Sequence, residues 1–213
     1  MPKQLSNTLR RYTSLTVALD MLINRRIVLI NPSKWDDGND THFIDLYKGS
    51  KGVGSVLASC MTMSTETYHH WKIFSDGLDG VCIEFNRPKL EADVAKRPEV
   101  RFEPVEYLLL KDLQSMSKKD VSRLPFIKRD AYGDEREWRM ISTPKEENVQ
   151  TWEVPISLAS IQRVRLSPWT NLALRQTIRT LIRAQEGCEQ MSVVSSGLTN
   201  SAKWRQAGAA IAS

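Results

Sequence analysis

Short apolar segments, each ending at turn-forming residues, are the feature that most restricts what this chain can fold into. They are rich in β-branched and aromatic residues, and their length is typical of strands. The expected strands are Arg10–Thr13, Arg26–Ile30, Val56–Met63, Gly80–Phe85, an extended region over Val100–Leu110, Glu135–Ser142, Trp152–Ile156, Val164–Leu166 and Met191–Val194.

Fewer segments have helical spacing. Apolar residues from Leu15 to Ile23 recur at helical intervals behind Thr13 or Ser14 as an N-cap, and a second helix should run from Asn171 to about Glu186, with Gly187 as its stop. We also expect a short helical turn at Tyr68–Phe74, a partly helical region at Lys111–Lys128, and loops at Trp35–Asp40 and Ser50–Gly54.

Strands and helices do not alternate as they would in a βα repeat. This favours the α+β class. The chain has 213 residues, of which 41% are hydrophobic, enough for one packed domain. We therefore predict a single α+β domain over residues 1–196, followed by a flexible Ala/Ser/Gly-rich tail over 197–213.

Composition points to a cytoplasmic protein without a membrane partner. No apolar run is long enough to span a bilayer, and the first residues lack an apolar signal region. The three cysteines, Cys60, Cys82 and Cys188, are odd in number and lack Cys-x-x-Cys spacing, which is typical of buried thiols in a reducing compartment. His69 and His70 follow Cys60, but no second pair lies at structural-zinc spacing, so we expect no metal.

The charge balance is moderately basic, with a formal net charge of +5 and an isoelectric point near 9.2. Such a balance suits a polyanionic partner, and many cytosolic enzymes share it. Several familiar sites are missing: the chain has no Gly-x-Ser-x-Gly elbow, no Gly-x-Gly-x-x-Gly and no Gly-Lys-Ser/Thr. Nucleophile-elbow, Rossmann and P-loop chemistry therefore lack support.

The sequence Asp134-Glu135-Arg136-Glu137-Trp138-Arg139 places two carboxylates two residues apart. On a strand, Glu135, Glu137 and Arg139 would share one face, and the two like charges would raise each other's pKa. Either this face is solvated and has no special role, or the pair lies in a polar cleft and binds a ligand.

Other polar residues are expected at strand ends: Arg11 and Tyr12, Thr62 with Ser64, and Trp71. A guanidinium beside an aromatic ring suits a phosphate or planar group, hydroxyls can orient a ribose, and a carboxylate can stabilise nearby positive charge. Such a set would suit a nucleotide whose glycosidic bond is broken. Each residue also has an ordinary reading, as a surface charge, a core aromatic or a helix cap.

In order along the chain, five motifs resemble a bacterial family known as domain of unknown function 2971. The resemblance covers about residues 9 to 195. Its motifs are Arg11-Tyr12-Thr13-Ser14, Pro32-Ser33-Lys34-Trp35-Asp36-Asp37-Gly38, Cys60-Met61-Thr62 with His70-Trp71-Lys72-Ile73-Phe74, Gly80-Val81-Cys82-Ile83, and Lys128 and Tyr132 before Glu135-Arg136-Glu137-Trp138-Arg139. Departures from the family pattern are Asp36 for Asn, Gly38 for Pro, Thr62 for Ser, and Phe74 for Tyr; Phe74 removes a hydroxyl.

That family in turn looks like the ADP-ribosyltransferase superfamily, in which a split antiparallel β-sheet core with flanking helices binds NAD. The resemblance implies that Glu137 is catalytic, bonding the ribose 2′-hydroxyl and stabilising the oxocarbenium-like transition state, with Glu135 orienting the acceptor. It implies cofactor-binding roles for Arg11, Tyr12, Thr62, Ser64 and Trp71. Arg139, Lys128 and Arg129 are the expected substrate-binding residues.

The resemblance therefore implies an NAD-dependent ADP-ribosyltransferase, with NAD as substrate and no metal. Basic residues just before the acidic motif favour an RNA or DNA acceptor over protein: Lys118, Lys119, Arg123, Lys128 and Arg129. Superfamily members often act as toxins or antiviral (phage-defence) effectors, so a neutralising antitoxin protein is a possible partner. The alternatives are a non-catalytic nucleic-acid- or protein-binding module on the same fold, and an NAD glycohydrolase with water as acceptor.

Overall fold

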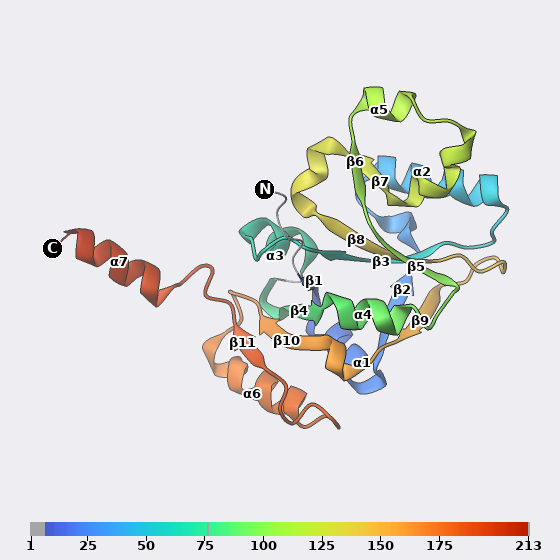
Figure 1. Ribbon diagram of the computed structural model, residues 1–213. Coiled ribbons are helices and arrows are strands. Elements are labelled where there is room, and N and C mark those ends of the chain that lie inside the picture. The colour runs from blue at the N-terminus through green and yellow to red at the C-terminus, as the bar shows by residue number, and fades with distance from the viewer. Residues whose placement is uncertain (1–6, 76, 213) are drawn as a thin grey trace.

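The computed structural model describes residues 7–75 and 77–212. It has mixed α+β architecture, with helices on both faces of a large sheet (Figure 1). The strands are β1 Thr8–Ser14, β2 Arg26–Ile30, β3 Leu57–Thr62, β4 Gly80–Asn86, β5 Val100–Pro104, β6 Glu106–Leu108, β7 Ile127–Arg129, β8 Glu137–Ser142, β9 Thr151–Pro155, β10 Ile161–Leu166 and β11 Val193–Ser195. The predicted α+β class is confirmed.

The α-helices are α1 Leu15–Asn24, α2 Gly38–Lys51, α3 Tyr68–Phe74, α4 Arg87–Val94, α5 Leu110–Gln114, α6 Leu172–Arg183 and α7 Ala202–Ala212. Five 3-10 segments complete the described elements: η1 Pro32–Lys34, η2 Gly77–Asp79, η3 Lys118–Phe126, η4 Asp130–Glu135 and η5 Leu158–Ser160.

The main sheet is split around β3. One series of strands runs β11-β10-β4-β1-β3-β2-β9, and β8 and β5 continue from the other side of β3. β3 contacts β1 at a single register position, Arg10 with Thr62, and β2 at one position, Ile30 with Ala58, whereas it pairs with β8 along its whole length. Apart from the parallel pair β10–β11, these pairings are antiparallel. The predicted split antiparallel core is thus present, and it opens a junction between β1 and β8.

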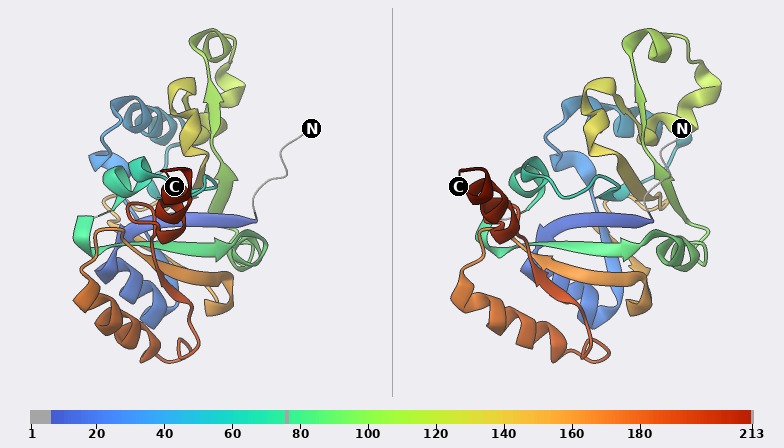
Figure 2. Two further views of the ribbon diagram at one scale, coloured as in Figure 1. Left: turned by 90° about the vertical axis from the view of Figure 1, so that its left-hand side faces the viewer. Right: turned by 60° about the vertical axis from the view of Figure 1, so that its left-hand side comes forward.

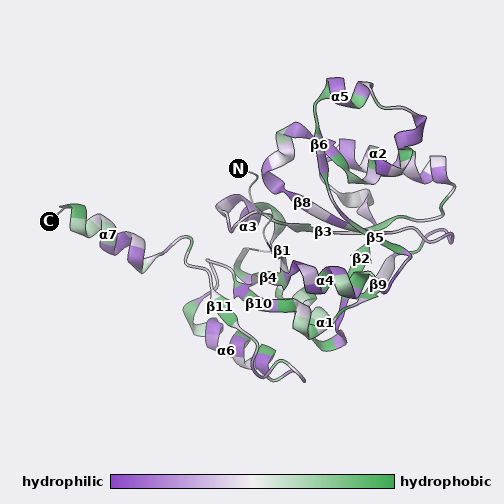
Figure 3. Cartoon of the chain, viewed as in Figure 1, coloured by the Kyte–Doolittle hydropathy of each residue, from purple (hydrophilic) through white to green (hydrophobic). Residues whose placement is uncertain are grey.

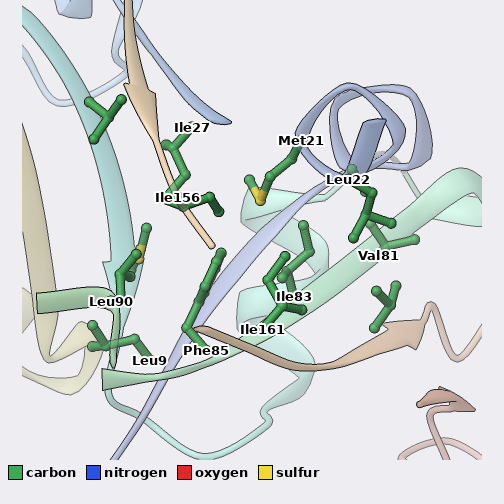
Figure 4. Close-up of a cluster of buried hydrophobic side chains, with 14 of the residues drawn as sticks. Leu9, Met21, Leu22, Ile27, Val81, Ile83, Phe85, Leu90, Ile156 and Ile161 are labelled. Carbon is green, nitrogen blue, oxygen red and sulfur yellow. The ribbon is translucent and has the colours of Figure 1, made fainter. Parts of the chain in front are cut away.

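Three apolar clusters explain the layers. The largest packs one sheet face against α1, α4 and α6; Figure 4 shows part of it, including Met21, Leu22, Phe85 and Leu90. On the opposite face, α2 and η3 cover the β3–β8 half through a cluster containing Ile44 and Phe126. α3 covers the β1–β4 half with a separate cluster of Tyr12, Trp71 and Cys82. Polar side chains fill the junction between these two smaller clusters.

Local sequence explains why several elements begin where they do. The Ser14 hydroxyl accepts a hydrogen bond from the Val17 N–H and starts α1, and the Asn171 side chain does the same for α6 with the Ala173 N–H. α6 ends at Arg183, three residues before the predicted end and without using Gly187 as its direct cap. Its buried apolar residues are Ile178 and Ile182, whereas Leu174 and Leu181 are exposed.

Two segments differ from the predicted loops. Residues 38–51 form α2, with the Asp37 side chain capping its N-terminus, so the loop expected over Trp35–Asp40 ends at Asp37. His42 is an exposed residue of this helix. The predicted tail contains α7, which projects from the body and is fully exposed over 202–211 (Figures 1 and 2). The helices α2 and α4 were missed because neither has a clear apolar periodicity.

Candidate functional site

β8 carries the acidic motif into the polar junction. Its residues pair in register with β3, so that Glu137 lies opposite Thr62 and Arg139 opposite Cys60. Glu137 and Arg139 alternate with Trp138 and Met140, which face the large core. The face predicted to be shared by Glu137 and Arg139 is therefore the one found. Trp138 is held further by an edge-to-face contact with Phe102.

Arg139 is the centre of a buried ion-pair network. Its Nη1 and Nη2 each lie 2.8 Å from an oxygen of Asp40, while its Nε and Nη2 lie 2.7 and 3.0 Å from the two oxygens of Glu137. Nη1 also donates to the Pro125 carbonyl. Arg139 is 0% exposed and Glu137 5%. The Arg139 guanidinium therefore fixes the carboxylate of Glu137, and its donors are turned inward.

Glu135 precedes the strand, so the sequence-based placement of this residue on it is wrong. It ends η4, and Arg136 then turns the chain into β8 with a left-handed φ of 46°. Glu135 nevertheless reaches the same cluster, because Lys128 Nζ lies 2.6 Å from one of its oxygens and 3.5 Å from an oxygen of Glu137. The ammonium group of Lys128, and not strand alternation, brings the two carboxylates together.

The cluster holds Glu137 in its ionised form. Burial by itself would raise the pKa of this carboxyl, but the charges of Arg139 and Lys128 bring its pKa below the ordinary value. Burial raises the pKa of Glu135, and Lys128 offsets only part of that effect. The thiol of Cys60 lies within hydrogen-bonding reach of Glu137, and burial raises the pKa of that thiol. The two acidic groups thus differ in character, with Glu137 the stronger acid.

Two hydroxyls of β3 and the following loop hold the motif in position. Thr62 Oγ1 donates to the carbonyl of Glu135 and accepts the Ser64 N–H at 2.8 Å. Ser64 Oγ donates to the Asp134 carbonyl at 2.6 Å. The Thr62 hydroxyl therefore contacts the backbone of the Glu-x-Glu segment, and the Ser64 hydroxyl contacts the residue just before it. Thr62 lies opposite Glu137 in the β3–β8 pair.

β1 contributes an arginine to this junction, and it is the neighbour of the predicted one. Arg10 lies opposite Thr62 and donates from Nη1 to the Ser64 carbonyl at 2.8 Å. Arg11 has the opposite alternation, and burial lowers the pKa of its guanidinium. Its Nη1 is buried without a hydrogen-bond partner among the described residues.

Tyr12 and Trp71 form an aromatic platform next to Arg10. Tyr12 stacks on His70 with ring centroids 5.5 Å apart and contacts Trp71 edge-on at 5.0 Å. Trp71 Nε1 donates to Glu66 at 2.8 Å, and Arg165 lies 3.5 Å from the same carboxylate. The Tyr12 hydroxyl is buried and has no hydrogen-bond partner among the described side chains.

The structure brings six predicted site residues to one junction: Thr62, Ser64, Lys128, Glu135, Glu137 and Arg139. Tyr12 and Trp71 lie in the neighbouring cluster under α3, and Arg10 of the same strand as Tyr12 bonds to the Ser64 carbonyl. Arg11 lies on the other side of β1, and Arg129 is exposed at the end of β7. The junction is buried, and two hollows of the surface lie elsewhere, one at the end of α2 beside Lys145 and Glu147 and one at residues 197–205.

Sequence reasoning missed Asp40 and Arg10. Asp40 is 4% exposed and holds Arg139 from α2 across a separation of 99 residues. Its only signal was membership of an acidic segment that looked like a surface loop. Arg10 is adjacent to the predicted Arg11. It is at the junction, and Arg11 is not, because Arg10 lies on the side of β1 that faces Thr62.

Two negative findings apply to the described part of the chain. Within it, no three His, Cys, Asp or Glu side chains are grouped as a metal ion would require. Among the same residues, no helix is long and apolar enough to cross a membrane.

Comparison with known proteins gives a family match over residues 70–140, to the model described as "Protein of unknown function (DUF2971)". This confirms the resemblance over α3, β4 and the acidic motif; the motifs before residue 70 lie outside the match. No curated protein matches the sequence. Among solved structures, the chain is similar to DarT from Thermus sp. 2.9 in complex with ADP-ribosylated single-stranded DNA. That pair shows 7% identity, coverage of 89% of this chain and 94% of that chain, and a TM-score of 0.45.

Proposed function

We propose that this protein is an NAD-dependent ADP-ribosyltransferase with Glu137 as the catalytic carboxylate and a nucleic acid as acceptor. The observation that supports it best is the register pair Thr62–Glu137, in which a hydroxyl and an ionised carboxylate lie side by side at the split of the sheet. Breaking the nicotinamide–ribose bond develops positive charge on the ribose. A carboxylate that remains ionised in a water-poor site stabilises that charge strongly.

Each neighbouring residue has a role in this proposal. Arg139 and Asp40 position Glu137, so Arg139 acts through that carboxylate and not by touching substrate. Lys128 keeps Glu135 beside Glu137, and Glu135, which is partly exposed, faces the acceptor. Arg10, which lies on the Thr62 side of β1, supplies positive charge for the diphosphate of NAD, and Tyr12 with Trp71 supplies an aromatic surface for a planar ring.

Because Glu137 is buried, the proposal requires part of the structure to move when NAD binds. NAD must reach a carboxylate of which only 5% is exposed, so binding has to move η4 or α3 away from the junction. Both segments are short, and η4 is held to β3 mainly by the Thr62 and Ser64 hydroxyls. The cost of that movement is a few hydrogen bonds, each worth about 1 kcal/mol.

The direct test incubates the protein with NAD labelled in its adenylate part, together with single-stranded DNA, RNA or cell-lysate protein. We expect label on nucleic acid, and loss of transfer by a factor of about 10² or more in Glu137→Gln. Glu153→Gln is the matched control, because it removes an exposed strand carboxylate paired with Arg26. Equal transfer by wild type and Glu137→Gln would end the catalytic assignment. Free ADP-ribose without labelled polymer would identify an NAD glycohydrolase instead.

A second function is favoured by one specific observation. Both oxygens of Glu137 are already bound by Arg139, and one is also near Lys128, which is what a purely structural ion pair would look like. A non-catalytic nucleic-acid- or protein-binding module would keep this network for stability. It predicts binding that is indifferent to NAD and to Glu137→Gln. Thermal stabilisation of the protein by NAD would contradict it.

A role as a toxin or phage-defence effector, with a neutralising antitoxin protein as partner, belongs to the same proposal. It predicts that expression arrests bacterial growth in wild type but not in Glu137→Gln, at equal protein levels. Growth arrest by both forms would assign toxicity to something other than the transfer reaction.

A further inference from the structure

The positive charge of this protein is concentrated in its last quarter. Residues 157–213 contain seven Lys and Arg against two Glu, a net charge of +5, so residues 1–156 are neutral with 23 of each sign. In the basic run before the acidic motif, Arg123 pairs with Glu106 and Asp120, and Lys128 with Glu135 and Glu137, so two of its five cations are already neutralised. The last quarter of the chain carries the whole excess of positive charge and is therefore the stronger candidate for an anion-binding surface.

Three arginines of α6 form the centre of this basic region. Arg175, Arg179 and Arg183 recur every four residues, which places them on one side of the helix, and α6 contains no acidic residue. Their spacing along the helix axis is about 6 Å per step. None of the three has a carboxylate partner among the described residues, in contrast to Arg25, Arg26 and Arg123. We call Arg175, Arg179 and Arg183 the arginine ladder.

The ladder is built into the fold at the edge of the sheet. Arg179 Nε donates to the Val193 carbonyl, Arg183 Nε to the Met191 carbonyl and Arg175 Nε to the Thr170 carbonyl, each at 3.2 Å. One acceptor belongs to β11, one lies just before that strand and one just before α6, and the three bonds fix the side chains in place. A guanidinium has five N–H donors, so most donors of each residue remain available to an oxyanion.

An exposed aromatic follows the ladder along the chain. β11 leads through Ser195 and Ser196 to a hollow lined by residues 197–201, Trp204 and Arg205. Trp204 is 82% exposed. Figure 3 shows hydrophilic and hydrophobic residues alternating along α6, and a hydrophilic start of α7. Fixed cations and an exposed aromatic ring are together the combination that binds single-stranded nucleic acid, through phosphates and base stacking.

The same region is continuous with the candidate site. Arg179 Nη2 donates to Ser195 Oγ, and the next residue, Ser196, donates to Glu66, the carboxylate that binds Trp71. A strand that follows the ladder toward Ser195 therefore arrives beside the aromatic platform. This gives a docking track that ends near the reacting centre.

We propose that the arginine ladder and Trp204 bind the backbone and a base of single-stranded nucleic acid and deliver it to the Glu137 site. This inference deepens the proposed function, because it names where the acceptor binds. Only the delivery of the acceptor to Glu137 rests on the proposed function. Because docking needs no NAD, binding and transfer can be measured separately.

The test measures equilibrium binding of fluorescent single-stranded DNA and RNA, each about 15 nucleotides, without NAD and over a range of salt concentrations. Each phosphate contact on a single strand contributes about −0.7 to the slope of log K against log salt. The variant R175Q/R179Q/R183Q should lower the magnitude of that slope by about 2 and weaken binding at least tenfold at 0.1 M salt. The control R25Q/R26Q/R123Q removes the same charge from paired arginines and should bind nearly as wild type.

Two further results decide the proposal if the ladder variant fails to fold. In the wild type, an oligonucleotide should protect the three ladder arginines from an arginine-specific dicarbonyl reagent, read by mass spectrometry, and leave Arg25, Arg26 and Arg123 reactive. Trp204→Ala should weaken binding severalfold without changing the salt slope. Wild-type affinity in the ladder variant, absence of protection, or binding only to anionic phospholipid vesicles would overturn the proposal.

Glu137→Gln separates this inference from the proposed function. It should bind oligonucleotide like the wild type although it transfers no label. Normal transfer with no binding to the ladder would refute the docking track alone, whereas ladder binding with no NAD chemistry in the wild type would refute the transferase alone.

Discussion

Replacement of Arg139 by methionine should destabilise the protein more than any other single loss of charge. The substitution keeps an unbranched side chain in the same space but removes the guanidinium that binds both Asp40 and Glu137, which are 4% and 5% exposed. The two carboxylates then have only Lys128 Nζ nearby, 4.0 and 3.5 Å away. Removing one partner of a buried ion pair costs about 3–5 kcal/mol, and here two carboxylates are left at once. Because a domain of this size has a total stability of roughly 5–15 kcal/mol, Arg139→Met should remove a large part of it.

The measurement is urea unfolding at pH 7, followed by tryptophan fluorescence, with thermal unfolding as a second readout. A loss of about 3–5 kcal/mol corresponds to a fall in Tm of about 6–20 °C. The control is Arg26→Met, because Arg26 also contacts two carboxylates, Asp20 and Glu153, but its side chain is 28% exposed. Surface ion pairs of that kind contribute little. The triple variant D40N/E137Q/R139M should recover much of the loss, since no buried charge remains unpaired.

Equal unfolding midpoints for Arg139→Met and Arg26→Met would refute the reasoning. Such a result would mean that Asp40 and Glu137 are hydrated when Arg139 is absent, so that the junction is open to water and the burial argument fails.

Three further predictions concern the same elements. The pKa of Glu137 is lower in the folded than in the unfolded chain. Its contribution to stability is therefore complete above the unfolded pKa of about 4.3 and is lost as pH falls through the folded pKa. Glu137→Gln should flatten the acid limb of a curve of unfolding free energy against pH, and an unchanged limb would contradict the assigned shift. Thr62→Val should cost about 1–3 kcal/mol in urea unfolding because two buried hydrogen bonds lose their partner, whereas Thr62→Ser should keep them; equal losses would exclude the hydroxyl as the cause. Gly54→Ala should lower the free energy of unfolding by about 1–3 kcal/mol, because the new Cβ would lie 2.2 Å from the Lys145 carbonyl oxygen. Gly49→Ala in α2 meets nothing within 4 Å and should not destabilise the protein. Calorimetry that ranks the two variants the other way would refute the packing argument.

Local sequence was sufficient to predict an element whose bounds depend only on its own residues and those next to it. β2 was predicted with its observed bounds, and α3 likewise, because each is a compact apolar or aromatic run bounded by turn residues or a cap. α2 and α4 were not found, since their contacts come from partners far away in sequence and their own apolar pattern is weak. The fold class followed from the many short strands, but the branch of the sheet at β3 depends on pairing that no local pattern contains.

The candidate site shows the same division. The alternation of β8 correctly placed Glu137 and Arg139 on the face opposite Trp138, because strand geometry alone decides it. The position of Glu135 was wrong, since a left-handed turn at Arg136 ends the preceding 3-10 segment just before the strand. Asp40 could not be assigned, because its role depends on a contact across 99 residues.

The net charge can be read from the sequence, but where the unpaired positive charges lie cannot. A net charge of +5 suggested a polyanionic partner, and the residues nearest the acidic motif seemed to supply it. In the folded protein, Lys128 and Arg123 are bound by carboxylates, whereas the arginines of α6 have only carbonyl and hydroxyl partners. Only the three-dimensional contacts distinguish these two groups.

The central claim is that Glu137 drives cleavage of the bond between nicotinamide and ribose, and release of nicotinamide from NAD measures this most directly, whatever the acceptor. With single-stranded nucleic acid present, we predict steady release by the wild type and by Glu153→Gln, and release slower by a factor of about 10² or more for Glu137→Gln. No release by the wild type, or equal release by Glu137→Gln, would contradict the claim.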